Sequence, residues 1–207
     1  MGKIITIGVT GASGAVLARA ALRLLEADAR VSRVHLVITE AGQRLVAQEL
    51  GVAAQDAKQA PALITGARTE KIDLLPNRDV GAAIASGSYP VDGMAVIPCS
   101  AGTLASIANG TSEDLLARAA DVCLKERRTL VLCVRETPLG RVHLENMLRA
   151  TDAGAVIMPV IPAFYYGPQT MDDWIEQYVC RVLAQLGLPQ EQQYRWEGSA
   201  KSRAREA

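Results

Sequence analysis

The sequence lacks several features that would assign it to a class at once. It contains no apolar run of about 18 residues or more, so we expect no membrane span and no membrane partner. Its formal net charge is zero, which argues against nucleic acid as a partner. The opening MGKIITIGV shows no separate charged, apolar and cleavage regions. We therefore expect no signal peptide and predict a cytoplasmic protein.

Metal-ligating side chains are also sparse. The two histidines, His35 and His143, are isolated, and the four cysteines are widely spaced without a C-x-x-C pair. This pattern predicts no metal site. Thiols of a cytoplasmic chain should be reduced. We interpret Cys123, Cys133 and Cys180 as small buried apolar residues.

The residues that are present indicate one globular domain. A length of 207 residues with 49% hydrophobic and 21% charged residues is enough for a substantial core. We place the domain at residues 1–188 and a polar C-terminal tail at 189–207. Apolar strand-like runs alternate with helical segments, which predicts an α/β class fold. Specifically, we expect a Rossmann-like, doubly wound, mainly parallel sheet with helices on both faces. Strands are predicted at residues 3–9, 33–39, 71–75, 93–97, 130–134 and 155–158. Helices are predicted at residues 15–27, 41–50, 56–60, from about 104, around 118–125, at 144–152 and at 171–186.

The first strand leads into a small-residue turn, TGASG, at residues 10–14. Glycines let a backbone approach a ligand closely, and the start of the next helix presents free N–H groups to an anion. Thr10 and Ser13 add hydroxyl donors. The alternative is a plain strand-to-helix turn, because no G-K-[ST] follows and the third glycine of G-x-G-x-x-G is missing.

Two further loops follow predicted strands and carry similar chemistry. The turn PCSAGT at residues 98–103 repeats the strand, small-residue turn, helix pattern, although Ser100 and Thr103 are also ordinary helix N-cap residues. The loop at residues 159–168 holds three prolines and three aromatic residues. We expect these loops to meet the first turn at the carboxyl edge of the sheet.

Residues 118–138, RAADVCLKERRTLVLCVRETP, concentrate positive charge. Arg118 and Lys125 are on a predicted helix, and Arg135 and Glu136 follow the buried strand at 130–134. A cation and an anion at the carboxyl end of such a strand suit a ligand site, and the excess of basic residues suggests an anionic ligand. Glu49, in contrast, stands alone on its predicted helix, and its pattern indicates solvated surface.

Seven motifs in order are similar to the UbiX-type flavin prenyltransferases, a family that includes small B subunits of hydroxyarylic acid decarboxylases. The resemblance covers residues 3–188. Its motifs are TGASG, ASGS (85–88), PCSAGTL, RAADVCLKERR, RETP, HLENML (143–148) and PAFYYGP (162–168).

The resemblance implies an activity. Such enzymes join the dimethylallyl group of dimethylallyl phosphate to reduced FMN and close a fourth ring, without a metal. The prenylated FMN serves a UbiD-type decarboxylase. The resemblance also implies a homo-oligomer, a trimer or a dodecamer, with active sites between subunits.

The resemblance further implies site residues. FMN contacts are expected at Gly11, Ala12, Ser13, Thr39, Ser100, Ala101, Gly102, Thr103 and Arg135. Dimethylallyl phosphate contacts are expected at Arg118, Lys125, Glu136, Tyr165 and Arg181, with Glu49 lining the same site. Catalytic roles are expected for Ser13, Glu49, Lys125 and Glu136. The residue types agree, because cations and hydroxyl donors stabilise a departing phosphate. Glu136 or the phosphate itself can act as base in ring closure, and Ser13 or Glu49 can relay protons.

Three alternatives compete with prenyl transfer. An FMN-dependent cysteine decarboxylase would share the fold and the flavin but would not need the phosphate-binding set. A non-catalytic, FMN-carrying accessory subunit of a decarboxylase would not need it either. A short-chain oxidoreductase would require Tyr-x-x-x-Lys, and no tyrosine in this sequence has lysine four residues on.

Overall fold

The computed structural model describes residues 2–52 and 59–196. These residues form one parallel six-stranded sheet with the strand order β3-β2-β1-β4-β5-β6. All carboxyl ends therefore share one edge, which confirms the predicted Rossmann-like α/β class. The strands are β1 (Lys3–Val9), β2 (Val31–Ile38), β3 (Ile72–Pro76), β4 (Gly93–Cys99), β5 (Thr129–Val134) and β6 (Val156–Ile157).

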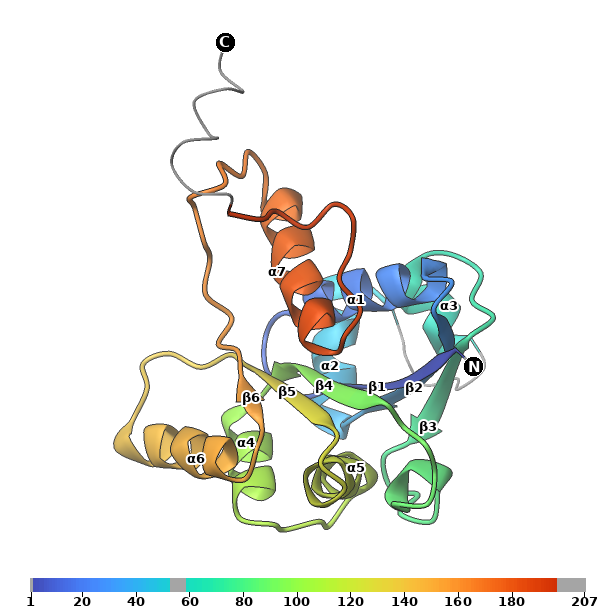
Figure 1. Cartoon of the computed structure of the whole chain (residues 1–207), viewed down its shortest axis with the longest axis vertical. Coiled ribbons are helices and arrows are strands. Elements are labelled where there is room, and N and C mark those ends of the chain that lie inside the picture. The colour runs from blue at the N-terminus through green and yellow to red at the C-terminus, as the bar shows by residue number, and fades with distance from the viewer. Residues whose placement is uncertain (1, 53–58, 197–207) are drawn as a thin grey trace.

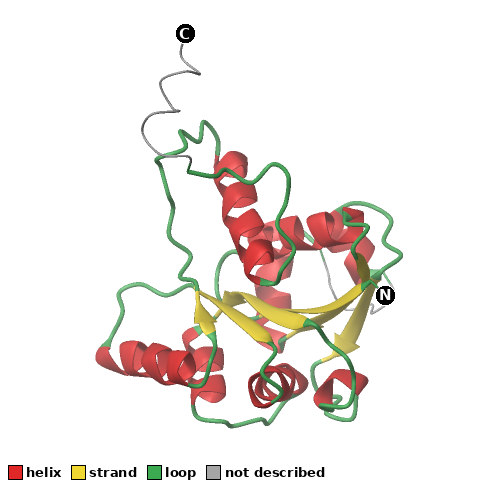
Figure 2. Cartoon of the chain, viewed as in Figure 1, coloured by secondary structure: helices red, strands yellow, loops and turns green. Residues whose placement is uncertain are grey.

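Helices cover both faces of the sheet, as Figure 1 and Figure 2 show. The buried apolar side chains form two clusters, one on each face. Helices α1 (Ala15–Ala27), α2 (Glu40–Leu50), α3 (Ala60–Thr65) and α7 (Met171–Gln185) pack into one cluster. Helices α4 (Ala101–Ala108), α5 (Leu115–Lys125), α6 (Arg141–Asp152) and the short helix η1 (Ala83–Ala85) border the other.

The local sequence explains the central elements. In β1, Ile5 and Ile7 are fully buried, since β1 lies between β2 and β4 and is covered on both faces. In α1, the buried Ala18, Leu22 and Leu25 are spaced four and three residues apart, so they lie on one face of the helix. The predicted strand 3–9 and helix 15–27 match β1 and α1 at both ends.

Other predicted boundaries differ by a few residues. Helix α4 begins at Ala101 rather than near 104, because Ser100 caps its first turn. Helix α6 begins at Arg141 rather than 144, and β6 covers only two residues of the predicted strand 155–158. The predicted helix 56–60 falls largely outside the described residues.

Two segments extend beyond the layers. Residues 158–170, here called the arm, link β6 to α7 and stand apart from the sheet (Figure 1). Residues 187–196, here called the strap, leave the end of α7 and run back along that helix toward the arm (Figure 1). The division into residues 1–188 and 189–207 stays a prediction. No helix among the described residues is long and apolar enough to cross a membrane.

Candidate active site

Two strand-end turns are joined through Thr10, which is fully buried. Its hydroxyl donates to the carbonyl of Pro98 at 2.9 Å and accepts from the backbone N–H of Ser100 at 2.7 Å. The turn after β1 and the turn after β4 are thus held side by side at the carboxyl edge. They meet between β1 and β4, where the strand order reverses direction, which is where open α/β sheets bind ligands.

Close packing fixes the shape of the first turn. A Cβ at Gly11 would come within 2.6 Å of the Ala41 Cβ, so a side chain at position 11 would displace the start of α2. Ala12 is buried and Ser13 is exposed beside it. Gly14 adopts φ 124° and provides no side chain to cap α1.

Glu49 supplies the missing cap. Its carboxylate accepts hydrogen bonds from the backbone N–H groups of Gly14 at 3.0 Å and Ala15 at 2.7 Å. A negative charge at this position complements the partial positive charge of the helix start. The interpretation of Glu49 as solvated surface is therefore wrong, because the last turn of α2 brings it to the TGASG turn. The anion expected at the start of α1 is a carboxylate of the chain itself.

The other hydroxyls expected at this edge serve as helix caps. Thr39 Oγ1 accepts from the N–H of Gly42 at 3.0 Å and begins α2. Ser100 Oγ accepts from the N–H of Thr103 at 3.3 Å and donates to Thr103 Oγ1 at 3.1 Å. A Cβ at Gly102 would meet no atom of the described residues within 4 Å, so this face of the α4 turn is open.

Arg135 follows β5 at the same edge. Its backbone N–H donates to the carbonyl of Cys99 at 3.0 Å, which brings it next to the α4 turn. Its Nε is buried and has no hydrogen-bond partner among the described residues. A buried, charged donor without an acceptor is costly, so this guanidinium suits a site where a ligand provides the acceptor. Glu136 beside it is exposed, and its carboxylate accepts from the N–H of Thr137 at 3.1 Å.

The arm and α7 contribute a second group. The Arg181 Nη1 lies 3.3 Å from the Tyr165 hydroxyl and donates to it. Tyr165 is 55% exposed, and its ring lies 5.7 Å from that of Tyr166. A guanidinium and a phenol at hydrogen-bond distance can together donate to one phosphate group.

Arg118 and Lys125 lie on α5, and Lys125 is far from the two turns within the chain. Helix α5 ends at Lys125, four residues before β5 begins. Lys125 is therefore at the amino edge, about 17 Å or a strand length from the turns. Arg118 pairs with Asp121 at 2.8 Å, and Lys125 pairs with Glu126. A single chain does not bring Lys125 together with Ser13 and Arg135.

Arg118 and Arg128 hold the ASGS segment through hydrogen bonds, and we call this pair of arginines the clamp. Arg118 Nε donates to the carbonyl of Ala85 at 3.2 Å. Arg128 donates to the carbonyls of Gly87 at 2.6 Å and Tyr89 at 2.7 Å. A Cβ at Gly87 would lie 2.7 Å from Lys125 Nζ, so the loop and Lys125 are in close contact.

Arg128 has a role that its sequence context did not reveal. The available signal was the positively charged cluster at residues 125–128, but charge alone does not distinguish its members. Arg127 adopts φ 58°, which turns the chain back into β5 after α5 ends. Arg128 then faces the loop. His35 supports the same loop, with its Nε2 2.9 Å from the Tyr89 hydroxyl.

The thiols do not contribute reactive groups. All four cysteines are reduced and buried, which confirms the structural interpretation of Cys123, Cys133 and Cys180. Burial raises the pKa of Cys133 and of Cys123 to about 12. A thiol with so high a pKa is not a nucleophile near neutral pH. No group of three His, Cys, Asp or Glu residues in the described part of the chain is arranged to hold a metal ion.

Comparisons with known proteins agree with the motifs. Residues 1–180 match the Flavoprotein family. The chain is 46% identical to the flavin prenyltransferase UbiX of Halalkalibacterium halodurans, and the match covers 93% of each chain. A crystal structure of AnUbiX (PadA1) in complex with FMN and dimethylallyl pyrophosphate is 39% identical, with a TM-score of 0.81. It matches 96% of this chain and 100% of that one.

A second similar solved structure is that of an oligomer. The dodecameric FMN-dependent UbiX-like decarboxylase from Escherichia coli O157:H7 is 40% identical, with a TM-score of 0.84. The match covers 94% of this chain and 100% of that one. The FMN-dependent cysteine decarboxylase TvaF, in contrast, is 15% identical with a TM-score of 0.57 over 89% of this chain and 98% of that one. That likeness is one of fold alone.

Proposed function

Because the chain belongs to the Flavoprotein family and, within it, to the UbiX flavin prenyltransferases, we propose that it transfers a dimethylallyl group from dimethylallyl phosphate to reduced FMN. The observation that carries this proposal is the likeness over nearly the whole chain to a solved structure containing FMN and dimethylallyl pyrophosphate. The transfer breaks the carbon–oxygen bond to phosphate. It forms a bond to the central-ring nitrogen of FMN and then a fourth ring, with phosphate and a proton released.

The carboxyl edge fits a bound flavin. The supporting observation is the buried Arg135 Nε without a partner, which needs an acceptor that the described residues do not supply. The open face at Gly102 and the exposed Ser13 border the same place. FMN contacts are proposed for Gly11, Ala12, Ser13, Thr39, Ser100, Ala101, Gly102, Thr103 and Arg135. Bound flavin supplies the nucleophilic nitrogen and the ring carbon.

The phosphate site is proposed to form between subunits. Arg181 and Tyr165 are already paired at 3.3 Å, but Lys125 is at the opposite edge of its own chain. A neighbouring copy can bring its Arg118 and Lys125 to this pair. Three cations and a phenol would then stabilise the charge that develops on the departing phosphate.

Exposed apolar residues support association with other copies. Val142 and Leu148 on α6 are 65% and 63% exposed, and Phe164 on the arm is 74% exposed. Large apolar side chains gathered on two projecting elements are typical of an interface. We propose a homo-oligomer, a trimer or a dodecamer, in the cytoplasm, whose product serves a UbiD-type decarboxylase.

We assign the proton-transfer roles from the positions of the residues next to the proposed flavin site. Glu136 is exposed next to Arg135, so it can take the proton lost during ring closure, as can the released phosphate. Glu49 is bound to the start of α1 beside Ser13, and either residue can relay a proton to or from the flavin nitrogen. Arg118, Lys125, Tyr165 and Arg181 bind and orient the phosphate.

Two variants test these roles under anaerobic conditions. Glu136→Gln and Lys125→Ala should retain FMN, because neither residue is in the proposed flavin set, yet should lose prenylated FMN formation. The readout is flavin absorbance for binding and mass spectrometry for product. Normal turnover by both variants would show that the assignment is wrong.

A further inference from the structure

The strap lies outside the region of the chain that matches the Flavoprotein family, which ends at residue 180. It begins at Gly187 (φ 71°), which turns the chain back after α7. Leu188 is fully buried in the core, so the strap is seated on the body of the protein from its second residue. From there it runs back beside α7 and reaches the arm (Figure 1).

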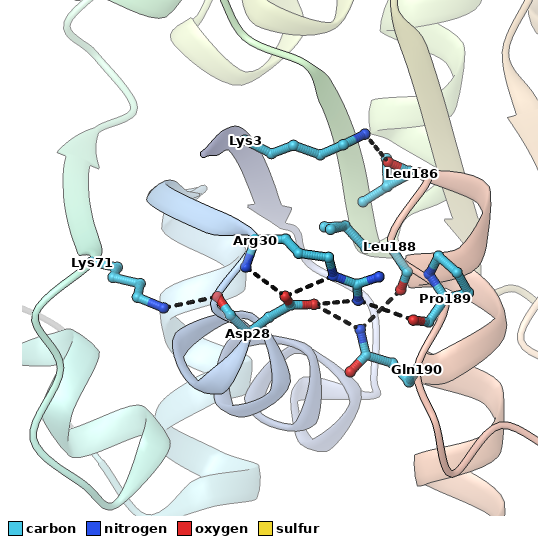
Figure 3. Close-up of polar contacts among 8 residues, drawn as sticks. All are labelled: Lys3, Asp28, Arg30, Lys71, Leu186, Leu188, Pro189 and Gln190. Atoms are coloured by element: carbon cyan, nitrogen blue, oxygen red, sulfur yellow. Dashed lines mark hydrogen bonds and ion pairs between the residues drawn. The ribbon is translucent and has the colours of Figure 1, made fainter. Parts of the chain in front are cut away.

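The base of the strap is anchored to the turn between α1 and β2, as Figure 3 shows. The Asp28 carboxylate accepts from Gln190 Nε2 at 3.1 Å and from Arg30. Arg30 also donates to the carbonyl of Pro189 at 3.0 Å. Nearby, Lys3 Nζ donates to the carbonyl of Leu186 at 3.2 Å, so the end of α7 is fixed as well.

The far end of the strap is bound to α7 mainly through Gln177, with a longer bond of 3.5 Å from Gln192 Nε2 to the Glu176 carboxylate. Gln177 Oε1 accepts from the backbone N–H of Tyr194 at 2.6 Å, and Gln177 Nε2 donates to the carbonyl of Gln192 at 2.9 Å. These two bonds hold the backbone of Gln192 and Tyr194 against the helix. The position of Tyr194 is therefore set from both ends of the strap.

Tyr194 contacts the residue that pairs with Arg181. Its ring lies 5.6 Å from that of Tyr165 and 5.9 Å from that of Tyr166. The Trp196 ring lies 6.2 Å from Tyr165 in an edge-on arrangement. The backbone of the arm next to Tyr165 makes a local hydrogen bond, from the Gly167 N–H to the Phe164 carbonyl at 3.0 Å. The strap rings therefore support the Tyr165 ring from the side.

We propose that Tyr194 is a positioning residue that holds the Tyr165 phenol against Arg181, so that the two act together on a phosphate group. Tyr194 acts through Tyr165 and does not itself contact the reacting atoms. This inference about Tyr194 rests on the proposed function for its catalytic consequence. The contacts of the strap with Tyr165 do not depend on it.

The first readout is independent of activity. The chain has two tryptophans, Trp174 and Trp196, so Trp174→Phe leaves Trp196 as the only indole, at the end of the strap. In that background, Tyr194→Ala should shift Trp196 emission to longer wavelength and increase its quenching by acrylamide. Tyr194→Phe, which keeps the ring, should match the parent. Unchanged emission in Tyr194→Ala would overturn the proposal.

The second readout compares the effects of the substitution on KM and on kcat. Tyr194→Ala should raise KM for dimethylallyl phosphate roughly three- to tenfold, the range that an aromatic pair energy implies, with little change in kcat. Tyr194→Phe should restore KM. Glu191→Gln, an exposed change on the same strap, is the matched control and should leave KM unchanged.

A double mutant decides whether Tyr194 acts through Tyr165. If it does, Tyr194→Ala should add nothing to the KM of a Tyr165→Ala variant. Fully additive effects would overturn the proposal. If the wild type forms no prenylated FMN, the proposed function fails. The inference then stands or falls on the Trp196 emission and on whether Tyr194→Ala weakens inorganic phosphate binding.

Discussion

The Glu49 carboxylate accepts a hydrogen bond from the Ala15 backbone N–H at 2.7 Å, so the end of α2 provides the negative charge at the start of α1. A helix start after a glycine-containing turn is an ordinary place to bind phosphate. In this protein that place is already filled by a carboxylate. The same residue that stabilises α1 is thereby held beside Ser13, where the proposed proton transfer occurs.

Removal of the Glu49 charge should destabilise the fold. We expect Glu49→Gln to lower the free energy of unfolding by about 1–2 kcal/mol, because it loses charged hydrogen bonds to Gly14 and Ala15. Urea unfolding measures this difference. Glu40→Gln on the same helix is the control, because its carboxylate is exposed and lies 3.7 Å from Arg44. An equal loss in both variants would contradict the capping role.

Arg128 and Arg127 should differ sharply although they are adjacent. Arg128→Met leaves the carbonyls of Gly87 and Tyr89 without a donor, so we expect a loss of about 1–3 kcal/mol and faster amide hydrogen exchange in residues 85–89. Arg127→Gly relieves a left-handed backbone and should change stability by no more than about 1 kcal/mol. If Arg127→Gly were the more damaging change, the clamp assignment would be wrong.

The Asp28 anchor should give acid-dependent stability. Hydrogen bonds from Arg30 hold the pKa of this carboxyl well below its usual 3.8. Its folded pKa is depressed, so its contribution is present above about 3.8 and is lost as the pH falls through the folded pKa. The gap in unfolding free energy between wild type and Asp28→Asn should be constant from pH 7 to pH 5 and shrink below pH 4. A gap that is as large at pH 2 as at pH 7 would contradict this.

The cysteine thiols should be unreactive in the folded protein. Burial raises the pKa of Cys133 to about 12 and of Cys180 to about 11, so little thiolate forms at pH 8. Ellman's reagent should react slowly with native protein and rapidly with all four cysteines after unfolding in urea. A native thiol that reacted within seconds would show an accessible cysteine that the fold does not explain.

Local patterns predicted the parts of the fold that depend on neighbouring residues. The strand at 3–9 and the helix at 15–27 follow from one apolar run, one small-residue turn and one amphipathic period. Ser100 was recognisable as a possible cap, but the structure was needed to show that α4 begins directly after it. The turns after β1 and β4 meet because parallel strands end at one edge.

Long-range partners were not predictable in this way. Glu49 reaches Ala15 across 34 residues, and Arg128 reaches Tyr89 across 39. The sequence pattern around a lone acid on a helix, or around one arginine among several, does not predict such contacts. Only the resemblance to a family moved Glu49 toward the site. The strap contact of Tyr194 with Tyr165 likewise depends on the path of the chain after α7.

Prenyl transfer to FMN is tested most directly by the mass of the flavin after reaction. Pure wild-type protein is incubated anaerobically with reduced FMN and dimethylallyl phosphate, beside a related UbiX enzyme as the positive control. We predict a flavin heavier by one dimethylallyl unit, with one phosphate released for each. Recovery of only unmodified FMN, where the control forms product, would contradict prenyl transfer by this protein.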